Sequence, residues 1–131
     1  MALTERTVKV LYVEDNEDIG RVFTELMRLM VDVDTEVLLA SDGEEGVKLA
    51  VREHPDIIFM DEELPVMDGI EATRCLRGYD SLGDVPVVMV SAHMDLQDRR
   101  QRAREAGVTH WIDKPFDPED LEATMRIALG L

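Results

Sequence analysis

Five polar residues each stand close behind a short apolar run of the sequence. In chain order they are Glu14, Asp15, Asp61, Ser91 and Lys114. Carboxylates, a hydroxyl and an ammonium group are the components of phosphoryl transfer, because a carboxylate can attack phosphorus while an ammonium and a hydroxyl hold its oxygens. If the fold brings these side chains together, they predict a site for phosphoryl transfer.

The three acids of this set also predict a divalent metal ion. Three carboxylates brought together repel one another, and Lys114 can neutralise only one of them. No histidine or cysteine joins the set, and oxygen ligands alone suit Mg²⁺ or Mn²⁺. We therefore expect Mg²⁺, with Mn²⁺ as a substitute, to complete the site and to neutralise charge on a phosphoryl group.

The segments that must position these residues alternate between strand and helix patterns. Apolar, β-branched runs predict strands, and apolar residues at helical spacing predict helices between and after them. The predicted strands span 8–13, 36–40, 56–60, 87–90 and 109–112. The predicted helices span 18–31, 44–53, 68–77, 95–106 and a last stretch capped by Asp117.

The strand patterns indicate how the sheet is covered. The runs at 8–13, 57–60 and 87–90 are apolar along nearly their whole length, which is typical of a parallel sheet buried on both faces. We predict an α/β fold, a doubly wound five-stranded parallel sheet with five helices, and one domain over residues 1–131. Ligands gather at the carboxyl ends of the strands in such sheets, which is where the five polar residues stand.

Composition excludes several classes of function. The net charge of −15 disfavours direct binding to nucleic acid or to an anionic membrane surface. The lone Cys75 excludes an internal disulfide and a thiolate zinc cluster. No apolar run is long enough to span a bilayer, and the first nine residues do not resemble a signal peptide. We expect a cytoplasmic protein that contacts neither nucleic acid nor membrane directly.

The sequence resembles the receiver domain of bacterial two-component response regulators over essentially its whole length. The resemblance lies in four signatures, each behind an expected strand: Glu14-Asp15, DEELPVMDG at 61–69, Ser91-Ala92 and KPF at 114–116. Each signature alone is weak, and their joint order carries the resemblance. It implies a flavodoxin-like sheet with strand order 2-1-3-4-5 and a single-domain regulator of the chemotaxis type.

The resemblance assigns roles to the acidic residues. Asp61 matches the phosphoacceptor, four residues before the proline of its signature. Asp15 matches the direct metal ligand, and Glu14 matches the acid that holds a water of the metal shell. The backbone carbonyl of Glu63 matches the third protein ligand.

The resemblance also implies a switch. Ser91 matches the hydroxyl that reaches for one phosphoryl oxygen, and Lys114 matches the lysine that pairs with another. The Lys114-Pro115 peptide is expected to be cis. Trp111 stands three residues before Lys114, where the family usually carries a switch aromatic. The alternative for Trp111 is a partly buried core or interface ring.

Glu63 and His93 suggest a gate to the site. They stand two residues after Asp61 and Ser91, at positions that vary in the family and influence the lifetime of the acyl phosphate. Our hypothesis is that Glu63 and His93 approach each other across the mouth and control the access of water. The alternative is two exposed polar side chains without mutual contact.

The expected partners also follow from the resemblance. A sensor histidine kinase or a histidine phosphotransfer domain would donate the phosphoryl group, and a downstream protein would bind the face around residues 95–115 and the last helix. The arginines at 99, 100, 102 and 104 lie on this face, although exposed arginines that pair with nearby acids explain them equally simply. The chain is expected to be a monomer or a phosphorylation-dependent dimer.

Three other functions remain as alternatives. The chain could be a receiver excised from a larger regulator or hybrid histidine kinase, relaying phosphate to a histidine phosphotransfer domain. A degenerate receiver that only binds partners is disfavoured, because all five key positions are filled. An aspartate-nucleophile phosphatase needs an aspartate two residues after its nucleophile, where Glu63 stands. We therefore expect a phosphoacceptor that catalyses only its own phosphorylation and dephosphorylation, and not an enzyme in the usual sense.

Overall fold

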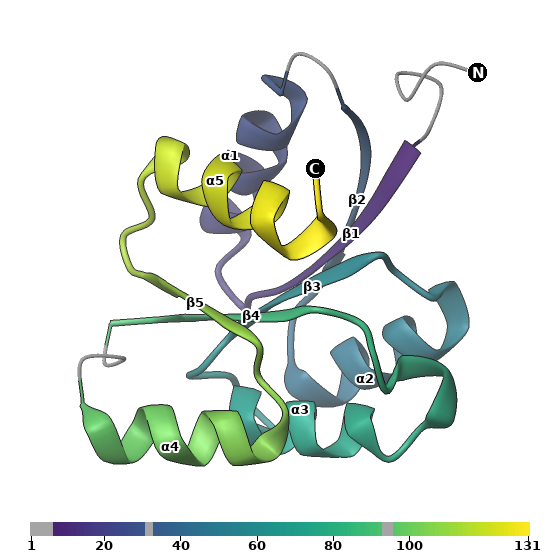
Figure 1. Ribbon diagram of the computed structural model, residues 1–131, viewed down its shortest axis with the longest axis vertical. Coiled ribbons are helices and arrows are strands. Elements are labelled where there is room, and N and C mark those ends of the chain that lie inside the picture. The colour runs from purple at the N-terminus through teal and green to yellow at the C-terminus, as the bar shows by residue number, and fades with distance from the viewer. Residues whose placement is uncertain (1–6, 31–32, 93–95) are drawn as a thin grey trace.

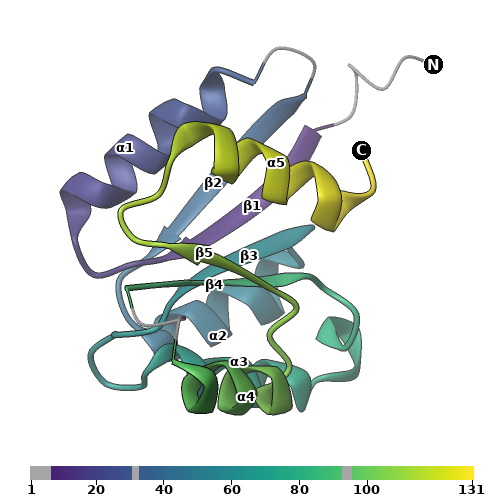
Figure 2. The ribbon, with the colours of Figure 1, turned by 60° about the vertical axis from the view of Figure 1, so that its left-hand side comes forward.

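The computed structural model describes residues 7–30, 33–92 and 96–131, which form one sheet between two layers of helices (Figures 1 and 2). The strands are β1 (Thr7–Val13), β2 (Asp34–Ala40), β3 (Ile57–Asp61), β4 (Val87–Ser91) and β5 (His110–Asp113). The helices are α1 (Glu17–Arg28), α2 (Gly43–Glu53), α3 (Gly69–Arg77), α4 (Gln97–Ala106) and α5 (Pro118–Leu129). A short 3₁₀ helix, η2 (Asp80–Leu82), lies between α3 and β4.

The sheet confirms the predicted topology. All four strand pairings are parallel, and the order is β2-β1-β3-β4-β5. The chain leaves β1 toward β2 on one side and returns to β3 on the other, so the loops that follow β1 and β3 diverge. A crevice at the carboxyl ends of these two strands is the usual consequence of such a reversal.

Two apolar layers sandwich the sheet, because alternate residues of each strand point to opposite faces. On one face, Val10, Tyr12 and Phe59 pack with the apolar side chains of α1 and α5. On the other face, Leu11 and Met60 pack with those of α2, α3 and α4. Figure 1 shows these two helix layers on either side of the strands. Burial on both faces explains the continuous apolar runs of the central strands.

Helix ends mostly agree with the predicted ones. The side chain of Asp117 accepts a hydrogen bond from the Glu119 amide at the start of α5, and Gly107 ends α4 in the left-handed conformation. The prediction for α1 was wrong at its end, because the helix stops at Arg28 and not at residue 31. The amides of Leu29 and Met30 bond to carbonyls three residues back, which tightens the last turn and ends the helix.

Helix α4 differs from the other helices in how it is held. Only Ala103 and Ala106 of this helix are buried, and its N-cap residue Leu96 makes no side-chain capping bond. The arginine-rich sequence leaves little apolar surface to pack against the sheet.

Within the three described ranges, no helix combines the length and apolarity that crossing a membrane requires.

Candidate functional site

The carboxyl ends of four strands meet at one surface pocket of about 430 Å³. Strand pairing sets β1 beside β3, β3 beside β4, and β4 beside β5, and it places Ser91 opposite Asp113. The sequence-predicted residues that line this pocket are Glu14, Asp15, Asp61, Glu63, Ser91 and Lys114. Residues that are up to 100 positions apart in the chain therefore share one site, as predicted.

Three carboxylates of this pocket are close enough to bind one cation. Glu14, Asp15 and Asp61 each offer an oxygen that lies within 4.8 Å of the other two. Glu14 and Asp61 are buried, whereas Asp15 is exposed, so water can reach the open side of the cluster. An oxygen-only donor set that is open to water fits Mg²⁺, which usually keeps several of its water ligands.

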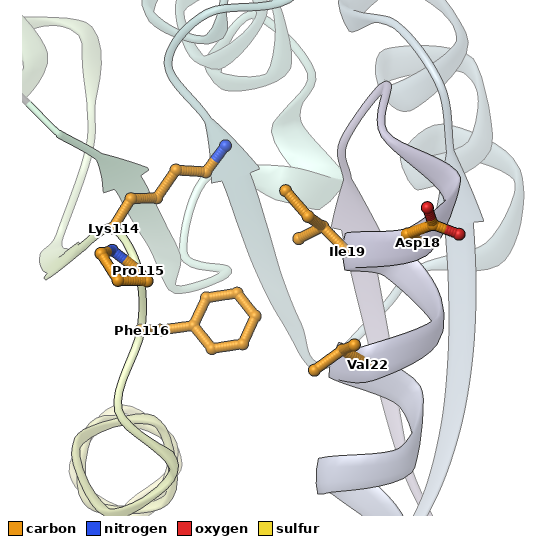
Figure 3. A pocket seen from close by; sticks show the side chains of 6 residues that line it. All are labelled: Asp18, Ile19, Val22, Lys114, Pro115 and Phe116. Carbon is orange, nitrogen blue, oxygen red and sulfur yellow. The ribbon is translucent and has the colours of Figure 1, made fainter.

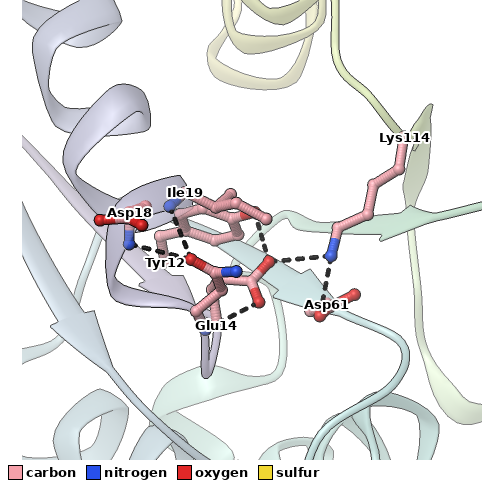
Figure 4. A network of polar contacts seen from close by, with 7 residues as sticks. Tyr12, Glu14, Asp18, Ile19, Asp61 and Lys114 are labelled. Carbon is pink, nitrogen blue, oxygen red and sulfur yellow. Dashed lines mark hydrogen bonds and ion pairs between the residues drawn. The ribbon is translucent and has the colours of Figure 1, made fainter.

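Lys114 joins two of these acids. Its Nζ atom lies 2.9 Å from Glu14 Oε1 and 3.0 Å from Asp61 Oδ2 (Figure 4). The backbone positions this lysine, because its amide donates to the Ser91 carbonyl and the Lys114-Pro115 peptide is cis, as predicted. One ammonium group beside three carboxylates leaves the site negative, which favours a cation there.

Burial and charge set the protonation of the site. Burial raises the pKa of Asp61 to about 6, against the opposing hydrogen bond from Lys114 and with help from the charge of Glu14. Burial acts in the same sense on Glu14, but bonds from Lys114 and the Asn16 amide outweigh it and lower the pKa. Partial burial and the adjacent Glu14 raise the pKa of Asp15. The ionised form of Asp61 is therefore incompletely compensated in the metal-free site, and a bound cation would favour it.

Comparison with known proteins identifies this arrangement. The sequence matches the family described as "Response regulator receiver domain" over residues 10–126. The chain belongs to this family. It is a receiver domain of the two-component response regulator type, and receiver domains are phosphoacceptors.

Several relatives show how this receiver compares in length. It is 32% identical to the polar-differentiation response regulator DivK of Brucella ovis, covering 95% of this chain and 98% of DivK. It is 36% identical to the "Probable transcriptional regulator ycf27" of Porphyridium aerugineum, covering 92% of this chain but 48% of that protein. The receiver thus spans about half the length of the ycf27 proteins and nearly all of DivK.

Solved structures share this fold, and one of them holds a magnesium ion. The chemotaxis protein CheY4 of Vibrio cholerae superposes with a TM-score of 0.87 at 30% identity, over 95% of this chain and all of CheY4. The receiver domain of a sensor histidine kinase from Pseudomonas aeruginosa superposes with a TM-score of 0.85 at 32% identity, over 96% of this chain and all of that domain. That domain was crystallised with a magnesium ion coordinated in its active site cleft.

Sequence reasoning missed Tyr12 in the receiver. Its hydroxyl donates a 3.1 Å hydrogen bond to Glu14 Oε1, from a side chain that is fully buried (Figure 4). The centre of the Tyr12 ring lies 4.3 Å from the centre of the Phe23 ring. Burial and the nearby Glu14 raise the pKa of the Tyr12 hydroxyl. The spacing held a signal, because residues two apart in an extended chain point to the same side.

Sequence reasoning also missed Glu62, whose side chain is buried beside the pocket. The Ser91 hydroxyl donates a hydrogen bond to Glu62 Oε1, and Arg99 Nη1 lies 2.6 Å from Glu62 Oε2. Ser91 was predicted to reach for a phosphoryl oxygen, whereas in this structure it contacts Glu62. An acid directly behind a fully buried strand was the available signal, although its orientation cannot be read from the sequence.

The arginines of α4 also make contacts that their sequence pattern did not specify. Arg99 pairs with the buried Glu62, as described above. The guanidinium groups of Arg100 and Arg104 lie 5.1 Å and 5.4 Å from the centre of the Trp111 ring. Trp111 is half-buried, so its position fits a ring at the interface between β5 and α4.

The predicted gate is only partly within the described residues. Glu63 is exposed at the pocket, and its backbone amide hydrogen-bonds the Asp61 carboxylate. His93 lies outside the residues that the structure describes. The hypothesis that Glu63 and His93 meet across the mouth therefore stays a prediction.

A second pocket, of about 440 Å³, lies beside Lys114. Ile19 and Val22 of α1 line one side, and Phe116 lies across from them in the segment between β5 and α5 (Figure 3). The lining is almost entirely apolar, and Asp18 and Pro115 complete it. This surface borders the lysine that contacts Asp61.

Proposed function

We propose that Asp61 accepts a phosphoryl group from a phosphohistidine, in a Mg²⁺-dependent reaction that changes a partner-binding face. The observation that carries this proposal is the convergence at the sheet edge: the acids Glu14, Asp15 and Asp61 lie together, and the Lys114 ammonium is 3.0 Å from Asp61. The receiver family and the strand-end positions support the same role for Asp61.

Each residue has a separate part in the transfer. An Asp61 carboxylate oxygen attacks phosphorus, an O–P bond forms, and the N–P bond of the donor breaks with its electron pair returning to the imidazole. Lys114 stays beside Asp61 and pairs with a phosphoryl oxygen, and Ser91 supplies a hydroxyl for another. Glu14, Asp15, Asp61 and the Glu63 carbonyl would hold the metal ion.

The metal ion, when bound, supplies positive charge that neutralises the phosphoryl oxygens, and Mn²⁺ can supply it as well. The protein residues do the remaining work. Asp61 must be ionised to attack, and a cation beside it favours the ionised form that burial opposes. Lys114 keeps Glu14 and Asp61 in place before the donor arrives.

The partners follow from this reaction. The donor is a sensor histidine kinase or a histidine phosphotransfer domain, and the reader is a downstream protein that binds around residues 95–115 and α5. We infer a cytoplasmic receiver over residues 1–131 that acts as a phosphoacceptor and not as an enzyme, as a monomer or a phosphorylation-dependent dimer. The chain covers nearly the whole length of DivK, a response regulator, which supports the phosphoacceptor role.

A second candidate keeps the same chemistry within a larger protein. The match to the receiver of a sensor histidine kinase and the partial coverage of the ycf27 proteins favour it. In that case Asp61 would pass its phosphoryl group to a histidine phosphotransfer domain. Incubating the phosphorylated receiver with such a domain separates the two, because a relay receiver transfers label rapidly and a terminal regulator mainly loses it to water.

The main test is labelling with acetyl phosphate and Mg²⁺, followed by mass spectrometry of the intact protein. We expect one phosphoryl group per chain, which is lost in Asp61→Asn and after chelation of the metal. Asp120→Asn, an exposed acid on α5, is the matched control and should label like the wild type. Labelling that persists in Asp61→Asn would refute the proposal. Multiple turnover of a generic phosphate ester would instead support the phosphatase alternative.

A further inference from the structure

The hydroxyl of Ser91 is engaged by a group that the proposed reaction does not use. It donates to Glu62 Oε1, and both side chains are buried. Glu62 follows Asp61 directly, and its amide bonds to the Val90 carbonyl, which extends the β3–β4 pairing by one residue. Successive side chains of an extended segment point to opposite sides, so Glu62 faces away from the carboxylate cluster.

The burial of Glu62 depends on two partners. Its side chain is only 5% exposed, and a buried carboxylate is costly unless it is hydrogen-bonded and charge-compensated. Ser91 satisfies one oxygen, and Arg99 satisfies the other at 2.6 Å. Loss of either contact would leave part of the carboxylate unsatisfied and would favour its movement toward water.

Arg99 connects this carboxylate to α4. It lies in the first turn of the helix, where no side chain caps the N-terminus. The apolar hold on α4 comes mainly from Ala103 and Ala106, which lie toward its other end. The Arg99–Glu62 ion pair therefore links the first turn of α4 to the residue that directly follows β3.

We propose that Glu62 is a positioning residue that competes with a phosphoryl group on Asp61 for the Ser91 hydroxyl, and that Arg99 transmits the outcome to α4. A serine hydroxyl has one hydrogen to donate, so it cannot serve both acceptors fully at once. When a phosphoryl oxygen takes that hydrogen, Glu62 loses a partner and its hold on Arg99 weakens. The first turn of α4 is then released. This inference rests on the proposed phosphorylation of Asp61.

The competition is tested by the affinity for beryllofluoride with saturating Mg²⁺, followed by ¹⁹F NMR so that Trp111 is not the reporter. We expect Glu62→Met to bind the mimic about threefold to tenfold more tightly than the wild type, the range that the net contribution of one ordinary hydrogen bond gives. Glu62→Gln should show a smaller gain in the same direction and covers the case in which Glu62→Met does not fold. Glu71→Met, an exposed α3 acid that pairs with Arg74, is the matched control and should not change the affinity.

A double-mutant cycle separates competition from a general structural effect. In a Ser91→Ala background no hydroxyl is contested, so Glu62→Met should leave the affinity unchanged. An equal gain with and without Ser91 would overturn the proposal, and so would an unchanged or weaker affinity in the Glu62 variants. A wild type that binds the mimic no better than Asp61→Asn would instead refute the proposed function itself.

Hydrogen exchange tests the connection to α4. The amides of α4 should exchange faster in the wild type after beryllofluoride binds, and Arg99→Met should already show this faster exchange when free. Arg102→Met, an exposed arginine of the same helix, should exchange like the free wild type. Slow exchange that persists in both Arg99→Met and the beryllofluoride complex would show that Arg99 does not transmit the change.

Discussion

Asp61 combines the role of proposed nucleophile with an unfavourable position for a charge. Its carboxylate is buried beside Glu14 and has Lys114 as its one described ion-pair partner. A buried acid whose pKa is raised from 3.8 to about 6 binds its proton more tightly in the folded state than in the unfolded state. The ionised Asp61 carboxylate therefore destabilises the folded receiver at neutral pH. The same burial leaves this carboxylate desolvated and reactive, and a bound metal ion can offset the loss of stability.

We therefore predict that Asp61→Asn stabilises the metal-free receiver in a pH-dependent way. Well below pH 3.8 the acid is protonated in both states and the two proteins should be similar in this respect. As pH rises from about 4 to about 6, the unfolded state loses its proton before the folded state does, so the wild type loses stability relative to the variant; the difference levels off above the folded pKa and should be roughly 1–3 kcal/mol at pH 8. Urea unfolding at pH 4.5 and pH 8 measures it. An equal difference at both values would show that titration of Asp61 is not the cause, and saturating Mg²⁺ should shrink the difference.

Tyr12 makes a second prediction at this scale. Tyr12→Phe keeps the ring packing against Phe23 but removes the hydroxyl that orients Glu14. Groups that orient a metal-binding residue typically contribute tenfold or more to metal affinity, so we expect Mg²⁺ to bind roughly tenfold more weakly while the fold persists. Titration followed by Trp111 fluorescence measures this. Tyr79→Phe, a partly exposed ring, is the control, and equal Mg²⁺ affinity in both variants would contradict a positioning role for Tyr12.

Among the secondary-structure elements, the start of α3 packs closely against the end of β3. Gly69 follows the α3 cap residue Asp68, and its amide donates to the Glu62 carbonyl at 2.9 Å. A Cβ atom at this position would lie 2.1 Å from the Asp61 carbonyl oxygen, which is backbone and cannot move aside alone. Glycine is therefore required here by close approach, and this contact fixes the loop that carries Asp61 to Asp68.

We predict that Gly69→Ala lowers the free energy of unfolding by about 2–4 kcal/mol and weakens Mg²⁺ binding, because α3 must move away from the end of β3. Gly83→Ala is the matched control, since a Cβ atom at Gly83 would lie 3.5 Å from the Asp80 carbonyl oxygen, which is an ordinary contact distance. Urea unfolding and a Mg²⁺ titration test both parts. A Gly69→Ala protein with wild-type Mg²⁺ affinity would show that α3 does not set the geometry of the site.

The strands and the helices differ in how well the sequence predicted their contacts. Apolar runs predicted all five strands, and the polar residues behind four of these runs predicted the members of the site, because backbone direction and strand ends follow from local pattern. The contacts of Tyr12, Glu62 and Arg99 were not predicted, because they depend on how side chains orient between elements. Helix α4 illustrates the difficulty, since a helix with two buried alanines carries too little apolar pattern to reveal which face it turns inward.

The molecule as a whole carries a net charge of −15. The pocket that contains Asp61 is negative as well, because three carboxylates lie together there. A phosphoryl donor is itself anionic, so approach to Asp61 is opposed unless a cation is present or the donor makes other contacts. The apolar pocket formed by Ile19, Val22 and Phe116 offers such contacts next to Lys114. A protein donor can use this surface, whereas a small donor such as acetyl phosphate cannot cover it.

This difference yields a prediction about Val22, whose side chain is 53% exposed at the pocket. Val22→Asp should slow phosphoryl transfer from a phosphorylated histidine phosphotransfer domain by about tenfold or more, because a charge would be buried in an apolar contact. Labelling by acetyl phosphate should stay close to that of the wild type. Leu29→Asp, a more exposed apolar residue directly after α1, is the matched control and should transfer normally from both donors. If Val22→Asp slowed both donors equally, the substitution would be disturbing the site itself, and if it slowed neither, the protein donor would approach Asp61 across another face.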